Sequence, residues 1–127
     1  WHVWLHSCGH INDFILPLVE CGVDVFNLQQ PRTLGIEEFG RKFAGKACFS
    51  SLCDIQLTLP GASREEIRNE AELLLSSWAM ENGGFILTDY DDNAAIGVTM
   101  ESKRVMYDAF MEFDPYKKQG RICNGCL

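Results

Sequence analysis

The feature that most constrains the fold is a fourfold alternation of short apolar runs with longer amphipathic segments. The first apolar run begins near Trp4, and the others span residues 23–28, 47–52 and 85–87. Runs of this length, apolar on both faces, are typical of strands in a buried parallel sheet. Because strands that alternate with helices form parallel sheets with right-handed crossovers, the order predicts an α/β fold.

The segments between these runs carry helical signals. Apolar stripes with helical spacing cover residues 11–19, 34–43, 67–78 and 105–113. Ser63 and Glu66 have the spacing of a capping box, and Thr99 is a candidate N-cap. Pro17 disrupts the first stripe, so we expect either a kink there or a helix that begins near Phe14.

Four strand–helix units are about half of a closed (β/α)8 barrel, which takes about 250 residues. A four-stranded parallel sheet cannot close on itself, so its edges need covering. Either another segment supplies four more units, or two copies pair, or the chain is an open layer of helices on a sheet. We expect residues 1–116 to form the α/β unit and residues 117–127 to form a polar, mobile tail. The chain begins with Trp1 inside a strand-like run, as a part of a longer protein would.

Composition and net charge limit the kinds of partner and the cellular location that we expect. The formal net charge is −7, with 18 acidic and 11 basic residues, which argues against nucleic acid as a partner. No apolar run approaches the roughly 20 residues that span a bilayer, so we expect no membrane segment. We find no secretory signal, and Cys8, Cys48 and Cys53 lie in or beside apolar runs. These positions favour free thiols and a cytoplasmic location over a disulfide framework.

The end of the first strand carries two soft metal ligands. His6 and Cys8 are two residues apart, so on a strand they point to the same side. An imidazole and a thiolate placed in this way could hold two corners of a zinc tetrahedron. The alternative is that both are ordinary core residues, because free cysteine is often buried and histidine often finds a partner.

The other strands also end in polar or reactive residues. After the second strand these are Asn27 and Gln29, after the third Cys53, Asp54 and Gln56, and after the fourth Asp89, Tyr90, Asp91 and Asp92. Side chains at the carboxyl ends of parallel strands converge on one site, so this pattern favours an enzyme. Asp89 or Asp91 could complete a site begun at the first strand, and Cys53 is a competing third ligand. A solvated acidic loop is the simpler alternative.

The tail contains Cys123 and Cys126 in a C-x-x-C pattern. A redox or zinc role for this pattern needs a neighbouring βαβ unit or a second ligand pair, and neither accompanies it. We therefore assign it no function.

Four segments together resemble the C-terminal half of the uroporphyrinogen decarboxylase superfamily. They are His6–Gly9, Gly22–Asn27, Cys53–Pro60 and Gly83–Leu87, and their order and spacing match along nearly all of residues 4–113. The resemblance implies the last four units of a (β/α)8 barrel, in agreement with the independent count of units.

The H-x-C-G motif is similar to that of the cobalamin-dependent methyltransferase branch. In that branch the residues matching His6 and Cys8 bind Zn2+, which activates a thiol for attack on the methyl group of a corrinoid protein. The third ligand there is a cysteine, and the position that matches it here is most nearly Asp91. An oxygen ligand gives a harder site with fewer thiolates, which puts the thiol substrate in question.

The resulting hypothesis is a zinc-dependent methyltransferase that works with a corrinoid protein. His6, Cys8 and Asp91 would bind the metal, and Asp89 and Tyr90 are the candidate catalytic residues. The substrate would contact four polar residues, Asn27, Gln29, Asp54 and Gln56. Two alternatives remain: tetrapyrrole decarboxylation, which needs no metal, and a non-catalytic half-barrel that needs a partner, either the N-terminal half or a second copy.

Overall fold

A computed structural model describes residues 1–117 of the chain. The predicted tail beyond Lys117, with Cys123 and Cys126, lies outside the described residues. The elements are β1 (Trp4–His6), the 3-10 turn η1 (Asn12–Phe14), α1 (Ile15–Glu20), β2 (Val25–Asn27), α2 (Pro31–Leu34), α3 (Ile36–Phe43), β3 (Cys48–Ser51), α4 (Arg64–Trp78), β4 (Phe85–Leu87) and α5 (Met100–Phe113). The alternation predicted from the sequence is therefore confirmed.

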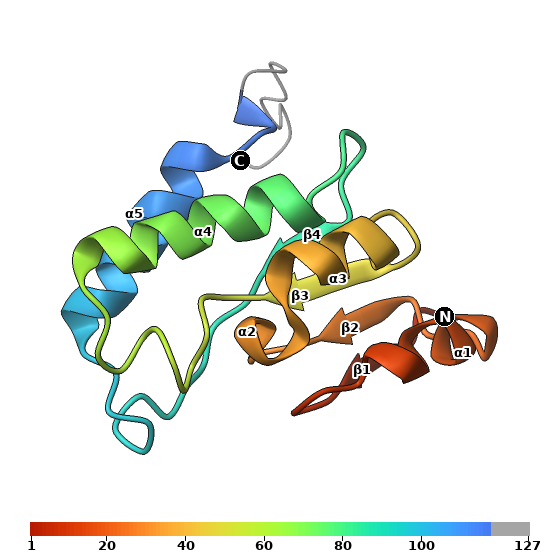
Figure 1. Cartoon of the computed structure of the whole chain (residues 1–127), viewed down its shortest axis with the longest axis horizontal. Coiled ribbons are helices and arrows are strands. Elements are labelled where there is room, and N and C mark those ends of the chain that lie inside the picture. The colour runs from red at the N-terminus through yellow and green to blue at the C-terminus, as the bar shows by residue number, and fades with distance from the viewer. Residues whose placement is uncertain (118–127) are drawn as a thin grey trace.

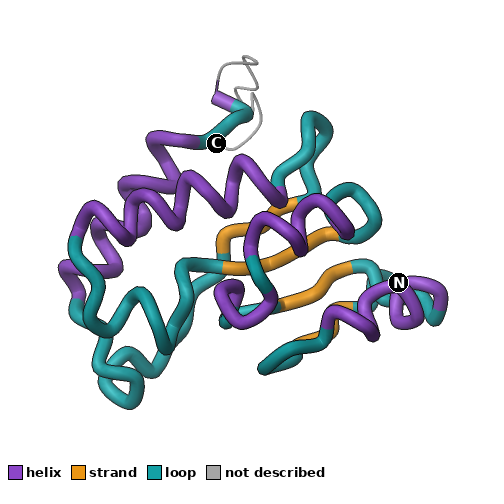
Figure 2. The backbone as a smooth tube through the Cα atoms, in the orientation of Figure 1, coloured by secondary structure: helices purple, strands orange, loops and turns teal. Residues whose placement is uncertain are grey.

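The four strands form one parallel sheet in the order β1-β2-β3-β4. Strands that follow one another in the sequence are neighbours in the sheet. Each connection therefore places the next strand directly beside the previous one, and the strand order advances in one direction across the sheet. Figure 2 shows the sheet with helices in front of it, and Figure 1 shows α4 and α5 side by side. The predicted α/β class with a parallel sheet is confirmed.

One row of the sheet faces the helices. The strand register aligns Leu5, Phe26, Phe49 and Phe85 across the four strands. The Phe49 ring lies 5.0 Å from that of Phe39 on α3 and 5.7 Å from that of Trp78 on α4. The Phe85 ring lies 5.8 Å from that of Phe110 on α5. Since side chains alternate along a strand, helices α3, α4 and α5 cover the same face of the sheet.

The neighbouring row therefore points to the opposite face. It contains His6, Asn27, Ser50 and Ile86. A sheet that winds in one direction, with its helices on one face, has the arrangement of strands and helices found in a (β/α)8 barrel. The four described units are compatible with half of such a barrel, and the two outer strands have no strand neighbour within residues 1–117.

Local signals explain most helix boundaries. The capping box is confirmed: the Ser63 hydroxyl accepts a hydrogen bond from the Glu66 amide, and the Glu66 carboxylate accepts one from the Ser63 amide at 2.8 Å. The Thr99 hydroxyl caps α5 by accepting from the Ser102 amide at 3.0 Å. Pro17 lies in the first turn of α1, which tolerates proline.

One helix begins slightly later than predicted. The stripe over residues 34–43 predicts a helix from about Leu34, but α3 begins at Ile36, because Gly35 has a φ of +77° and separates it from the short helix α2, which was not predicted. This left-handed conformation is open to glycine because it has no Cβ. Within the described part of the chain, no helix is both long enough and apolar enough to cross a bilayer.

Candidate functional site

The end of β1 carries a chain of polar contacts. The His6 Nδ1 atom lies 2.7 Å from Asn27 Oδ1, and Asn27 Nδ2 donates to Ser50 Oγ at 3.2 Å. On the other side of the imidazole, His6 Nε2 lies 3.5 Å from Cys8 Sγ. An amide oxygen only accepts, so Nδ1 carries a proton, and in a neutral imidazole with this tautomer Nε2 is the nitrogen with the free lone pair.

The strand register produces this arrangement. His6, Asn27 and Ser50 occupy matching positions on three adjacent strands, on the face opposite the helices. Asn27 and Ser50 are buried, whereas His6 and Cys8 are exposed. Sequence reasoning missed Ser50. The signal was present, because in each of the three strands one apolar residue facing the helices is followed directly by a polar one.

The loop after Cys8 is held by a neighbouring glutamine. The Gly9 amide donates to Gln30 Oε1 at 2.7 Å, and Gly9 has a φ of +76°, which favours glycine. From the sequence, Gln29 was the glutamine predicted to contact the substrate in this region. Gln29 is half-buried, and its backbone carbonyl accepts from the Ile55 amide. The side chain that reaches the His6–Cys8 loop is that of Gln30.

Asp54 anchors the β3–α4 loop instead of facing an open site. Its side chain is fully buried. Its Oδ1 accepts from the amides of Gln56 and Leu57, each at 2.9 Å, and its Oδ2 accepts from the Arg32 amide at 3.2 Å. Both carboxylate oxygens therefore already have partners, whereas the Gln56 side chain nearby is exposed.

A second buried carboxylate, missed by sequence reasoning, supports the same loop. Glu70 of α4 accepts from the Asp54 amide at 2.6 Å and from the Thr58 hydroxyl at 2.5 Å. The Arg32 guanidinium lies 3.9 Å from it. Burial raises the pKa of Glu70, against the opposing effect of these hydrogen bonds. This cluster holds the loop after β3 through side-chain contacts from α4.

Cys53, the alternative third ligand, is turned into the core. It is fully buried, and its thiol donates to the Ile67 carbonyl at 3.5 Å. Burial, reinforced by the nearby Glu70 and Asp54 carboxylates, raises the pKa of the Cys53 thiol. A thiol that keeps its proton is a poor metal ligand, because metals bind the thiolate.

The residues of the acidic loop after β4 have different surroundings. Asp89 pairs with the buried Lys103 of α5 through a hydrogen bond of 2.8 Å from Nζ to Oδ2. Desolvation raises the pKa of Asp89, but hydrogen bonds, chiefly from Lys103, outweigh it and hold the pKa below its ordinary value. Desolvation and Asp89 raise the pKa of Tyr107 to about 12. Tyr90 packs partly into the core, and Asp91 is exposed.

The structure does not bring the three predicted metal ligands together. Within residues 1–117, no group of three or more histidine, cysteine, aspartate or glutamate side chains is arranged to hold a metal ion. His6 and Cys8 lie beside each other at the end of β1, while Asp91 follows β4 at the opposite edge of the sheet. Two strands separate these edges, and a metal site formed by His6, Cys8 and Asp91 stays a prediction.

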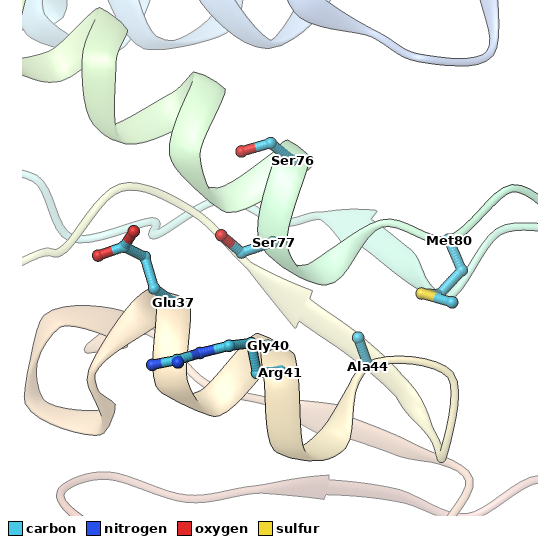
Figure 3. A pocket seen from close by; sticks show the side chains of 7 residues that line it. All are labelled: Glu37, Gly40, Arg41, Ala44, Ser76, Ser77 and Met80. Carbon is cyan, nitrogen blue, oxygen red and sulfur yellow. The ribbon is translucent and has the colours of Figure 1, made fainter.

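A separate hollow lies between α3 and α4, away from the strand ends. Figure 3 shows its lining, which consists of Glu37, Gly40, Arg41, Ala44, Ser76, Ser77 and Met80. None of the site residues predicted from the sequence lines it. The hollow therefore does not belong to the polar cluster at the strand ends.

Comparison with known proteins adds no relative. No protein-family model matches the chain, and neither the curated proteins nor the solved structures contain a match. The resemblance to the uroporphyrinogen decarboxylase superfamily therefore rests on the motif residues alone.

Proposed function

We propose that the chain is the zinc-binding half of a (β/α)8 methyltransferase that works with a corrinoid protein. The observation that supports this proposal is the contact between His6 and Cys8, with the imidazole held by the buried Asn27 amide. The His6 tautomer leaves Nε2, the nitrogen nearest the sulfur, as the one able to bind a metal. A hydrogen bond to the second ring nitrogen is the usual support of a zinc-binding histidine.

The distance between the two ligand atoms also fits zinc. A tetrahedral site with bonds of about 2.3 Å to sulfur and about 2.0–2.1 Å to nitrogen separates the two atoms by about 3.6 Å. The distance between Cys8 Sγ and His6 Nε2 is 3.5 Å. Two of the ligand positions therefore need little rearrangement to accept the ion. The exposure of both side chains leaves room for further ligands.

Zinc at this position would keep a thiol substrate ionised at neutral pH for attack on a methyl group carried by the corrinoid protein. Asn27 orients the imidazole, and Gln30 fixes the loop that carries the thiolate. Gln29 and the exposed Gln56 would contact the substrate, and Asp54 would act by positioning the loop that carries Gln56. Asp89 and Tyr90, which follow β4, stay the candidate catalytic residues.

A zinc titration tests the proposal. We expect the His6→Ala and Cys8→Ser variants to lose stoichiometric zinc, and Asn27→Leu to bind it about 10- to 100-fold more weakly because the imidazole loses its orienting partner. Cys21→Ser is the matched control, since Cys21 is an exposed free thiol away from the site. Unchanged zinc binding by both ligand variants would contradict the proposal. A wild-type chain that binds no zinc would favour tetrapyrrole decarboxylation.

A further inference from the structure

We propose that Ser50 is a positioning residue for His6 and that it acts through Asn27. Its buried hydroxyl fixes the direction of the Asn27 amide, and the amide in turn keeps the proton of the His6 ring on Nδ1 and leaves Nε2 free. The proposal rests on the proposed function for what Nε2 binds. Its own content is a property of the chain without metal, namely which nitrogen of one imidazole carries the proton.

The strand register brings the three residues into one row. His6 on β1 is aligned with Asn27 on β2, and Asn27 is aligned with Ser50 on β3. The next position of the row, on β4, is Ile86, whose side chain has no polar group. Asn27 is 8% exposed and Ser50 is fully buried, so water competes little for the contact between them. Within this row, Asn27 is therefore the polar side chain next to the Ser50 hydroxyl.

The distances indicate the direction of the hydrogen bonds. An amide side chain can turn over, so Asn27 could present either its oxygen or its nitrogen to Ser50. A hydroxyl that donates to an oxygen usually lies about 2.5–3.0 Å from it, whereas an amide nitrogen lies about 2.7–3.2 Å from an oxygen acceptor. The Asn27 amide lies 3.2 Å from Ser50 Oγ, which fits the nitrogen donating to the hydroxyl oxygen. The Asn27 oxygen then faces His6, 2.7 Å from Nδ1.

The direction of the amide decides the tautomer of the imidazole. With the Asn27 oxygen toward the ring, Nδ1 must donate, and in the neutral ring Nε2, 3.5 Å from Cys8 Sγ, keeps its lone pair. If the amide turned over, its nitrogen would donate to Nδ1, and Nε2 would carry the proton and could not bind a metal. Without the Ser50 hydroxyl, the contact with the imidazole alone remains, and that contact forms with either tautomer. Ser50 therefore selects between the two.

Nitrogen NMR of the histidine rings tests the proposal. Proton–nitrogen correlation spectra at about pH 8, where an ordinary histidine is neutral, distinguish the two tautomers, and His6→Ala identifies the His6 signals. We expect the wild-type His6 to carry its proton on Nδ1, and Ser50→Ala to raise the Nε2–H form to about half, because the two amide orientations then have equal partners. Ser50→Thr keeps a hydroxyl and should restore the wild-type tautomer.

Ser51→Ala is the matched control. Ser51 is the next residue of β3 and is also fully buried, but its hydroxyl donates to the Leu28 carbonyl at 2.6 Å. This variant loses the same oxygen atom from the same strand without touching Asn27. It should therefore leave the His6 tautomer as in the wild type.

Three outcomes would overturn the role of Ser50: a wild-type His6 with its proton on Nε2, a Ser50→Ala variant with the wild-type tautomer, or an equal shift in Ser51→Ala. If circular dichroism shows that Ser50→Ala does not fold, Ser50→Cys replaces it, because a thiol fills a similar space and accepts only weakly. Zinc affinity is a second readout, and it should fall about twofold when half of the rings have the competent tautomer. A wild-type chain that binds no zinc overturns the proposed function, and the tautomer still decides on Ser50.

Discussion

Replacement of Glu70 tests whether the β3–α4 loop is held by hydrogen bonds or by charge. Glu70 is 8% exposed and accepts from the Asp54 amide and the Thr58 hydroxyl. In Glu70→Leu both donors lose their acceptor in a buried site. Each unpaired buried group costs about 1–3 kcal/mol, so we expect the two together to lower the free energy of unfolding by about 2–6 kcal/mol. A typical domain has only about 5–15 kcal/mol in total, so this loss is large.

Glu70→Gln should behave differently. The amide oxygen can still accept from the Asp54 amide, and the amide nitrogen can donate to the Thr58 hydroxyl oxygen. The Arg32 guanidinium, 52% exposed and 3.9 Å away, adds little attraction to the charge. We therefore expect Glu70→Gln to remain within about 1 kcal/mol of the wild type at pH 7. Urea denaturation followed by far-UV circular dichroism measures both variants, with Glu72→Leu on the exposed side of α4 as the control.

The pH dependence adds a second readout. The folded protein holds the Glu70 proton to a higher pH than the unfolded chain, where the carboxyl titrates near 4.5. Folding therefore takes up a proton between these two pKa values, and this residue's contribution to stability falls as pH rises through that window. Glu70→Gln lacks the titration, so it should gain relative to the wild type from about pH 4.5 upward. Equal losses in the Gln and Leu variants at pH 7 would refute the reasoning, because charge would then carry the interaction.

Two further predictions concern the helices. A Cβ at Gly40 would lie 2.4 Å from the Ser77 carbonyl oxygen. We therefore expect urea melts to show that Gly40→Ala is destabilised by about 1–3 kcal/mol, although alanine improves helix propensity by about 1 kcal/mol. A stabilised variant would contradict this close approach of α3 and α4. Lys103→Met should cost about 1 kcal/mol at pH 7, discounted because Asp89 is 43% exposed. Since the pKa of folded Asp89 is held below its ordinary 3.8, that cost should vanish as pH falls below about 4, and a constant difference across pH would exclude the ion pair as its cause.

The order of strands and helices was predictable because its signals are local. The capping box at Ser63 and the N-cap at Thr99 depend on residues within one turn, and both are found in the structure. The start of α3 was placed two residues too early because Leu34 continues its apolar stripe across Gly35. Periodicity describes which side a residue faces, and it does not report a single residue in a left-handed conformation.

The buried charges were missed for a different reason. Neither Glu70 nor Lys103 was identified from the sequence. Their positions carried a signal, since Glu70 follows Ile67 by three residues and precedes Leu74 by four, which places it on the buried stripe of α4. Lys103 precedes Met106 by three residues and Phe110 by seven, which places it on the buried stripe of α5. A charged residue within an apolar stripe predicts a buried partner, although the sequence does not identify it.

Local sequence patterns do not identify the third metal ligand. Its identity depends on how far apart the tips of β1 and β4 lie, and this distance is set by whether the sheet stays open or closes. The alternation of side chains along a strand correctly predicts which face of the sheet a residue occupies, as for His6 and Asn27, which are paired in the strand register. For Asp91 the same argument does not hold, because two strands lie between β1 and β4. The curvature of the sheet across them sets the distance from Asp91 to His6, and residue spacing does not specify this curvature. Residue spacing therefore predicts the His6–Cys8 pair but not the position of Asp91 relative to it.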